Sequence, residues 1–84
     1  MQPDAVKELV EKGLPDCQVT VSGDGSHFDV TVVGEVFAGQ SLLNKQRMVL
    51  ATISDEITSG AIHAVNVKAY TPEEWARASK LQIS

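Results

Sequence analysis

Three side chains in this sequence carry chemistry that ordinary surface residues lack: His27, His63 and the single cysteine, Cys17. Neutral imidazole is the commonest metal ligand in proteins, and its borderline softness suits zinc, copper or the iron of a cluster. Two histidines do not complete a closed four-ligand site, and the chain has no third histidine. A metal bound here would therefore need ligands from another molecule.

A structural interpretation of the same residues stays open beside the metal interpretation. In it, His63 is a hydrogen-bonded histidine at a strand end and His27 is a solvated turn residue. Cys17 is in phase with Val19 and Val21, which predicts a small, buried, unreactive side chain. As the only cysteine it cannot form an internal disulfide, which is typical of proteins from reducing compartments.

No catalytic machinery is visible in the sequence. It contains no Gly-x-Ser-x-Gly elbow, no phosphate-binding Gly-x-x-x-x-Gly-Lys loop and no His-Glu-x-x-His motif. The glycines at Gly23 and Gly25 lie between two expected strands and do not open a helix, so they predict a turn and not a phosphate cradle. We therefore expect a binding protein and not an enzyme.

The histidines must be positioned by strands, and alternating apolar and polar residues predict three of them. The first two, Cys17 to Ser22 and His27 to Val33, are joined by a Gly-Asp-Gly-Ser turn, which predicts an antiparallel hairpin. The third is expected over Ala61 to Ala69, with His63 on the same face as Val65 and Val67.

Helical spacing and capping residues predict three helices around these strands. The first covers Pro3 to Lys12, with Gly13 just past its end and Leu14 placed for the apolar contact of a Schellman cap with Leu9. A connection over residues 35–40 is expected to contain a short helical turn. The second helix covers Ser41 to Thr58, with an apolar stripe formed by Leu42, Val49, Leu50, Ile53 and Ile57. The third covers Pro72 to Leu81 and begins with a capping box and a hydrophobic staple between Tyr70 and Trp75.

The expected order is therefore α-β-β-α-β-α, an α+β fold in a single domain of residues 1–84. A strand-helix-strand unit is normally a right-handed crossover between parallel strands. His27 and His63 each stand at the N-terminal start of one of those strands, so they should emerge at the same edge of the sheet. Neighbouring strands lie only about 5 Å apart, which allows two imidazoles to serve one ion.

Charge and composition narrow the classes of partner. The formal charge of −4 argues against a protein whose affinity comes from neutralising phosphates. No stretch approaches about 18 apolar residues and the first helix is interrupted by charges, so we expect a cytoplasmic protein without a membrane segment. Two sets of basic residues remain: Lys68, Arg77 and Lys80 as a docking strip for an acidic partner or glutathione, and Lys45 and Arg47 as a nucleic-acid contact. Each set has a solubilising surface as its alternative.

Three motifs in the same order resemble the BolA family, above all its bacterial IbaG-like subgroup. They are VSGDGSHF from Val21, FAGQSLLNKQR from Phe37 and IHAVNVKAYTPEEW from Ile62, and the similarity covers nearly the whole chain. The resemblance implies a fold related to the class II KH domain, with a three-stranded mixed sheet and helices packed on one face.

The resemblance also implies a function. Members of this family pair with monothiol glutaredoxins and share a glutathione-containing [2Fe-2S] cluster, in iron-sulfur trafficking or iron sensing. By position, His63 is the implied ligand from the third strand and His27 the ligand or near-ligand from the hairpin loop, and no cofactor is expected in the isolated chain. A homodimer is left open. A DNA-binding regulator ranks second, because the sequence lacks the Gly-x-x-Gly clamp of KH domains and Gly39-Gln40 does not replace it.

Overall fold

A computed structural model describes residues 1–83 of the chain, with side chains through Lys80. Its elements follow the predicted order. The short helical turn expected within residues 35–40 is a 3₁₀ helix, and one additional short α-helix is present among the described residues. The elements are α1 (Pro3–Gly13), β1 (Gln18–Gly23), β2 (His27–Val33), η1 (Glu35–Phe37), α2 (Leu42–Ala51), α3 (Ser54–Thr58), β3 (Ala64–Tyr70) and α4 (Pro72–Ile83).

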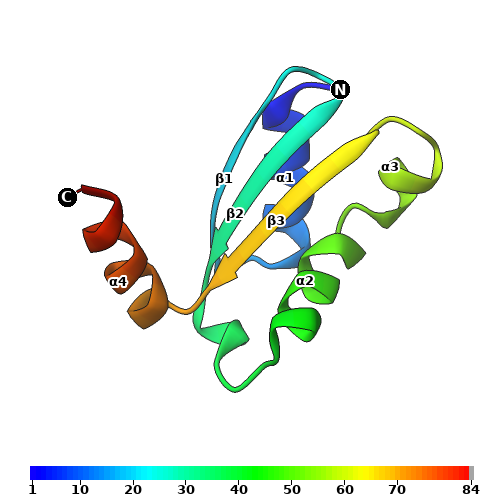
Figure 1. Cartoon of the computed structure of the whole chain (residues 1–84). Helices are drawn as coiled ribbons and strands as arrows, with labels where there is room; N and C mark the ends of the chain where they lie inside the picture. The colour runs from blue at the N-terminus through cyan, green and yellow to red at the C-terminus, as the bar shows by residue number, and fades with distance from the viewer. Residues whose placement is uncertain (84) are drawn as a thin grey trace.

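The three strands form one mixed sheet in the order β1-β2-β3 (Figure 1). β1 and β2 are antiparallel, as the hairpin turn predicts, and Val21 pairs with Val30. β2 and β3 are parallel, as the crossover predicts, and Val30 pairs with Val67. The middle strand therefore has one antiparallel and one parallel neighbour, and the starts of β2 and β3 share one end of the sheet.

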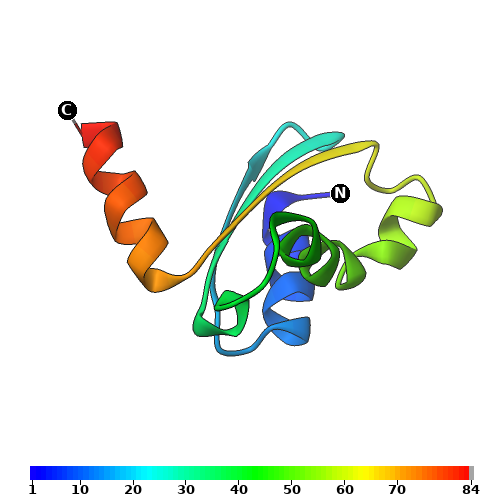
Figure 2. The ribbon, with the colours of Figure 1, turned by 60° about the horizontal axis from the view of Figure 1, so that its bottom comes forward.

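Helices α1 and α2 lie on one side of the sheet, and α4 stands apart from them beyond the end of β3 (Figure 2). The alternation in the strands explains this layering, because every second side chain of β2 is apolar and buried beneath the helices: Phe28, Val30 and Val32. The opposite side carries His27, Asp29 and Thr31 from β2 and Asn66 and Lys68 from β3. We call this polar side the open face.

The core lies between the sheet and the first two helices. Apolar residues from α1, β2, η1 and α2 meet there, and their side chains are almost completely removed from water: Val6, Val10, Val30, Val32, Phe37, Val49 and Ile53. Burying side chains of this size stabilises a fold by about 1.5–3 kcal/mol each before the entropy of ordering is subtracted.

The end of α1 differs from the predicted Schellman cap. Gly13 is part of the helix and is not among the glycines with positive φ, so the left-handed residue of that cap is missing. A Cβ at Gly13 would overlap Thr52 Cγ2 at 2.5 Å. Glycine is required here because α1 and the end of α2 pack closely together.

The long helix predicted over residues 41–58 is wrong, because the structure divides it into α2 and α3. Ser41 caps the beginning as predicted, its Oγ accepting a hydrogen bond from Asn44 N at 3.1 Å. The helix ends where Thr52 Oγ1 donates to Val49 O at 2.6 Å and Ile53 leaves helical geometry, with φ −126° and ψ 20°. Two members of the predicted stripe lie at the surface: Leu42, in the first turn of α2, is 71% exposed, and Ile57, in α3, is 39% exposed.

The start of α4 is capped as predicted. Thr71 N donates to Glu74 Oε1 at 2.8 Å, and Glu74 N donates to Thr71 Oγ1 at 3.2 Å, which is the reciprocal pattern of a capping box. The Tyr70 and Trp75 rings lie 5.4 Å apart between centroids, which confirms the staple. Among residues 1–83, no helix is long and apolar enough to cross a membrane.

A buried ion pair links α4 to α2. Lys45 is 8% exposed, and its Nζ donates to both carboxylate oxygens of Glu74, at 2.8 and 3.0 Å. The hydrogen bonds from Lys45 and from the Thr71 amide lower the pKa of Glu74 from its ordinary 4.5 to about 2. The pair therefore fixes α4 at its first turn, beside the contact between Tyr70 and Trp75.

Candidate functional site

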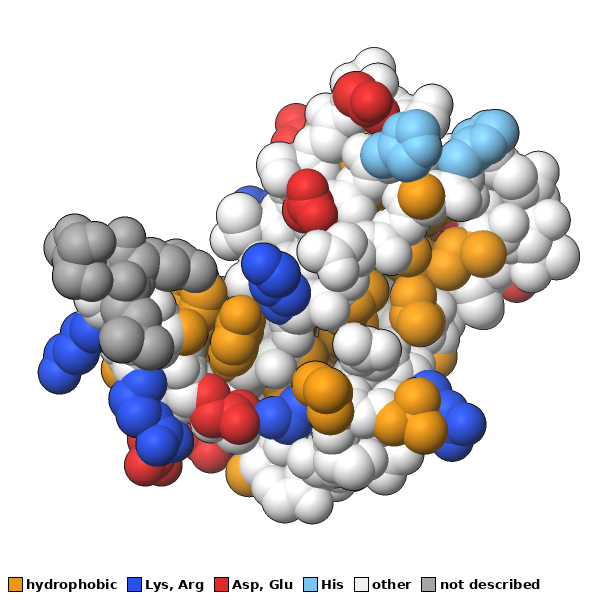
Figure 3. Space-filling model, in the orientation of Figure 1, with side chains coloured by type: hydrophobic (Ala, Val, Ile, Leu, Met, Phe, Trp, Pro, Cys, Tyr) orange, Lys and Arg blue, Asp and Glu red, His pale blue; other side chains and the backbone are white. Residues whose placement is uncertain are grey.

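The structure brings the two histidines to the same end of the sheet. His27 is the first residue of β2 and pairs with Ala64, the first residue of β3, so His63 lies next to that pair. Both histidine side chains are exposed. Figure 3 shows them as neighbouring side chains at one end of the visible face. The prediction that both imidazoles emerge at one sheet edge is confirmed.

The backbone ties the hairpin turn to the start of β3. Ser26 O accepts hydrogen bonds from both His63 N and Ala64 N, each at 3.1 Å. The turn before His27 and the residue His63 therefore move as one unit. The third strand begins at Ala64 and not at Ala61 as predicted, so His63 lies in a bend just before it and is not held to the alternation of the strand.

Asp24 organises the turn on the His27 side. Its Oδ1 accepts hydrogen bonds from Ser26 N at 3.0 Å and from His27 N at 2.9 Å, as an Asx turn does. The bond from the His27 amide, followed by that from Ser26, lowers the pKa of Asp24. An ionised carboxylate therefore lies near the His27 ring, whose Nδ1 is 3.7 Å from Asp24 Oδ1. That spacing is too long for a hydrogen bond and leaves the ring free to bind elsewhere.

A hollow of about 270 Å³ adjoins the histidine end of the sheet. His27, Asp29 and Asn66 contribute its polar lining, and Asn66 Nδ2 donates to Asp29 Oδ1 at 3.3 Å. In the described part of the chain, no group of three or more His, Cys, Asp or Glu side chains is arranged to hold a metal ion. The imidazoles of His27 and His63 both face solvent, so they could supply two of the four ligands of a metal site while another molecule supplies the rest.

The predicted docking residues lie on two different elements. Lys68 is exposed on the open face of β3, whereas Arg77 and Lys80 are exposed on α4. Arg77 is 4.0 Å from Glu73, one turn earlier in the helix. Figure 3 shows basic side chains interspersed with acidic ones on this side of the molecule.

The two residues predicted to contact nucleic acid have different surroundings. Arg47 is exposed, but Lys45 is buried against Glu74 and its charge is neutralised there. Interpreting Lys45 as a phosphate contact is therefore wrong. No local pattern indicates this burial, because lysine is rarely buried and its partner lies 29 positions away.

Cys17 is only partly buried, whereas the sequence predicted a buried thiol. It lines a hollow of about 600 Å³ together with Val36, Pro72 and Trp75, between the start of β1 and the first turn of α4. Desolvation, followed by the charge of Asp16, raises the pKa of its thiol. A thiol of this kind is mostly protonated at neutral pH and so is a poor nucleophile, which agrees with the expectation that it is unreactive.

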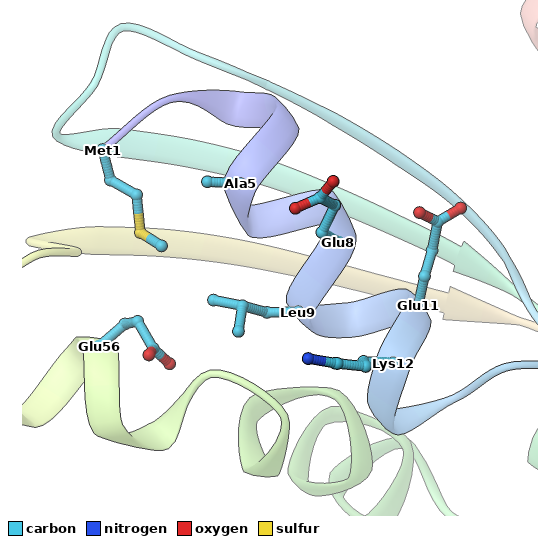
Figure 4. Close-up of a pocket in the computed structure, with 7 residues that line it drawn as sticks. All are labelled: Met1, Ala5, Glu8, Leu9, Glu11, Lys12 and Glu56. Atoms are coloured by element: carbon cyan, nitrogen blue, oxygen red, sulfur yellow. The ribbon is translucent and has the colours of Figure 1, made fainter.

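Sequence reasoning missed a larger groove between α1 and α3. It has a volume of about 650 Å³, and Figure 4 shows side chains from both helices around one space. The break between α2 and α3 creates it, and a continuous helix over residues 41–58 would not. Its lining mixes apolar and charged side chains: Met1, Ala5, Glu8, Leu9, Glu11, Lys12 and Glu56.

These features define a class of protein: a small α+β domain that presents two exposed imidazoles at one end of a three-stranded mixed sheet. The chain belongs to the BolA-like protein family, whose pattern matches residues 9–74. The family expected from the three sequence motifs is therefore confirmed.

Individual relatives agree with this assignment. The chain is 46% identical over 81 residues to the acid stress protein IbaG of Escherichia coli K12, and the alignment covers 96% of each protein. It is 39% identical over 74 residues to the DNA-binding transcriptional regulator BolA of Vibrio cholerae, covering 88% of this chain and 66% of that protein.

A solved structure supports the fold. A BolA protein homologue from Coxiella burnetii matches with a TM-score of 0.82 and 35% identity, covering 92% of this chain and 99% of that one. The predicted α+β fold with a three-stranded mixed sheet is confirmed.

Proposed function

We propose that this protein binds a monothiol glutaredoxin and shares with it a glutathione-containing [2Fe-2S] cluster, in iron-sulfur trafficking or iron sensing. His63 and His27 are the residues through which this chain would take part. The observation that carries the proposal is the pairing of two exposed imidazoles at adjacent strand starts, with no further ligand supplied nearby by the described residues.

The geometry supports a shared site over a self-contained one. An imidazole at a strand start is held by backbone pairing, and the bonds from His63 N and Ala64 N to Ser26 O fix the position of both histidines relative to each other. Each ring still faces solvent and is accessible to a second protein. Glutaredoxin and glutathione would supply the thiolates, which are the usual ligands of iron-sulfur clusters.

The cluster, when bound, supplies a redox-active and transferable iron centre. The role of this chain is to offer neutral imidazole nitrogen, which raises the potential of a cluster above that of an all-thiolate site. Because coordination requires the deprotonated ring, acid competes with this role. Asp24 positions the His27 backbone through its two amide contacts and acts on the ring only through its charge.

The proposal is tested by mixing the protein with a monothiol glutaredoxin, glutathione, iron and sulfide without oxygen, and recording visible absorption and circular dichroism. We expect His63→Ala to change the spectrum of the mixed complex and to speed loss of the cluster. His27→Ala should have the same effect if that ring is a direct ligand, and a smaller one if it supports the site. Thr31→Ala, on the same face of β2 but outside the hollow that His27 lines, is the matched control and should leave the spectrum unchanged. An unaltered spectrum for His63→Ala would refute the role of this residue.

A DNA-binding role is the second candidate, and similarity to the DNA-binding transcriptional regulator BolA of Vibrio cholerae favours it. On this chain it has less support, because Lys45 is neutralised by Glu74 and the net charge is −4. Titration against duplex DNA at two salt concentrations distinguishes the candidates, since binding driven by phosphate contacts must weaken steeply as salt rises.

A further inference from the structure

The outer edge of β1 is unpaired in the described part of the chain. β1 and β3 are the two edge strands of the sheet, and β2 is the only neighbour of each. A free edge presents backbone N–H and C=O groups that only another extended backbone can satisfy as a row.

The register identifies which groups of β1 point outward. Ser26 O bonds to Ala64 N and Gly34 N bonds to Tyr70 O, so the even-numbered residues of β2 direct their backbone groups toward β3. The odd-numbered residues of β2 therefore face β1 and bond to their partners Gln18, Thr20 and Ser22. The remaining residues, Val19, Val21 and Gly23, direct their N–H and C=O groups away from the sheet.

Nothing in β1 protects this edge against pairing. Gln18–Gly23 contains no charged residue and no proline, and its pairing with β2 is continuous from Gln18–Val33 to Gly23–Phe28, without a bulge. Proteins normally protect an exposed edge strand from pairing with a charged residue, a proline or a β-bulge. The other edge strand, β3, carries Lys68 in its middle, whereas both edge strands contact a helix on the core side of the sheet, β1 contacting α1 and β3 contacting α2.

Charge at the two ends of β1 decides between possible occupants. Asp16 precedes the strand and Asp24 follows it, and both are exposed. In an antiparallel pair of two β1 strands, Asp16 of one copy would lie near Asp24 of the other at both ends. Two chains that each carry a net charge of −4 would then be joined through facing carboxylates, which is unfavourable. A strand with uncharged residues in its middle and basic residues at its ends has the complementary pattern.

We propose that the outer edge of β1 is a docking site for an extended segment of another protein, paired through the backbone groups of Val19, Val21 and Gly23 and flanked by basic residues that meet Asp16 and Asp24. This surface lies on the opposite side of β2 from β3, and it meets the histidine site only at Asp24, whose Oδ1 is 3.7 Å from His27 Nδ1.

The test uses a synthetic probe, the acetylated and amidated peptide Lys-Thr-Val-Thr-Val-Thr-Val-Thr-Lys, whose lysines are spaced like the two aspartates. Amide hydrogen exchange of the intact protein is measured by NMR with and without the peptide. We expect exchange at Val19, Val21 and Gly23 to slow by about tenfold when about nine-tenths of the protein is bound. The control peptide has proline at every position between the two lysines, so it keeps both charges but has no N–H group there to donate to the edge.

Variants separate the two parts of the proposal. Asp16→Asn and Asp24→Asn should each weaken peptide binding about two- to fivefold, since exposed ion pairs contribute little individually. Asn at position 24 keeps the oxygen that accepts from Ser26 and His27, so the turn is preserved. Val21→Pro removes an outward N–H without removing a bond to β2 and should abolish binding. If that variant does not fold, the two aspartate variants still test the proposal.

Three results would overturn the proposal. Exchange at these three amides that is unaffected by the valine peptide would show that the edge does not pair. An equal effect of the proline peptide would show that charge alone acts. Protection of the same amides that grows with protein concentration in the absence of peptide would show that the occupant is a second copy of the chain.

Discussion

Replacing Lys45 with methionine tests whether the buried ion pair holds α4 in place. Methionine keeps the length and apolar stem of lysine but removes the Nζ that donates to both Glu74 oxygens, at 2.8 and 3.0 Å. The Glu74 side chain remains 39% exposed and can be rehydrated, so the loss should be smaller than for a fully buried pair. We expect Lys45→Met to lower the free energy of unfolding by about 1–2 kcal/mol. In a domain of this size, that lowers Tm by about 4–16 °C.

The pH dependence of this loss has a defined sign. Above pH 4.5, Glu74 is ionised in both the folded and the unfolded chain, and the pair contributes in full. As the pH falls from 4.5 toward 2, the unfolded chain takes up a proton that folded Glu74 does not, so the contribution declines. The difference in stability between wild type and Lys45→Met should therefore be constant near neutral pH and shrink toward pH 2.

Urea unfolding followed by two signals measures both effects. Far-ultraviolet circular dichroism reports the whole fold, and the fluorescence of Trp75, the single tryptophan, reports the packing of α4 against Tyr70. Arg47→Met is the matched control, because Arg47 lies on the same helix and is exposed, and it should change stability by less than about 0.5 kcal/mol. A variant at Lys45 with wild-type stability and fluorescence, or a deficit that does not depend on pH, would refute this account.

Two further predictions concern the region around Cys17. A Cβ at Gly34 would collide with Cys17 Sγ, so Gly34→Ala should destabilise the protein by about 1–3 kcal/mol, and Cys17→Ala in the same chain should recover part of that loss in urea unfolding. Desolvation and the charge of Asp16 raise the pKa of the Cys17 thiol, so its reaction with a disulfide reagent should be slower at pH 8 than that of a free cysteine. The rise of its reaction rate with pH should occur at a higher pH than for free cysteine. A reaction rate equal to that of free cysteine would contradict the partial burial of the thiol.

Local signals in the sequence predicted most of the sheet. Alternation located β1 and β2, the Gly-Asp-Gly-Ser turn joined them, and the rule for parallel crossovers brought His27 and His63 to one end. The capping box of α4 was equally local, since all of its hydrogen bonds lie within Thr71 to Glu74. Patterns that span a few residues are reliable because the interactions they encode span the same few residues.

The errors arose where a distant residue decided the outcome. Helical spacing continued through Thr52 and Ile53, but packing of the helix end against Gly13 and the Thr52 hydrogen bond to Val49 ended α2 there. The prediction that Lys45 is an exposed contact to nucleic acid failed because its partner, Glu74, belongs to a different helix. Neither the groove between α1 and α3 nor the partial exposure of Cys17 had a sequence signal, since both depend on how separate elements pack.

The parallel pairing of β2 with β3 affects when during folding the histidine site appears. The β1–β2 hairpin closes a turn of a few residues, whereas β3 pairs only after residues 34–63 have looped back to the sheet. Closing the longer loop costs more entropy and takes longer, so β3 is expected to join after the hairpin has formed. His63 reaches His27 only at that step, so the two imidazoles come together after the hairpin has formed.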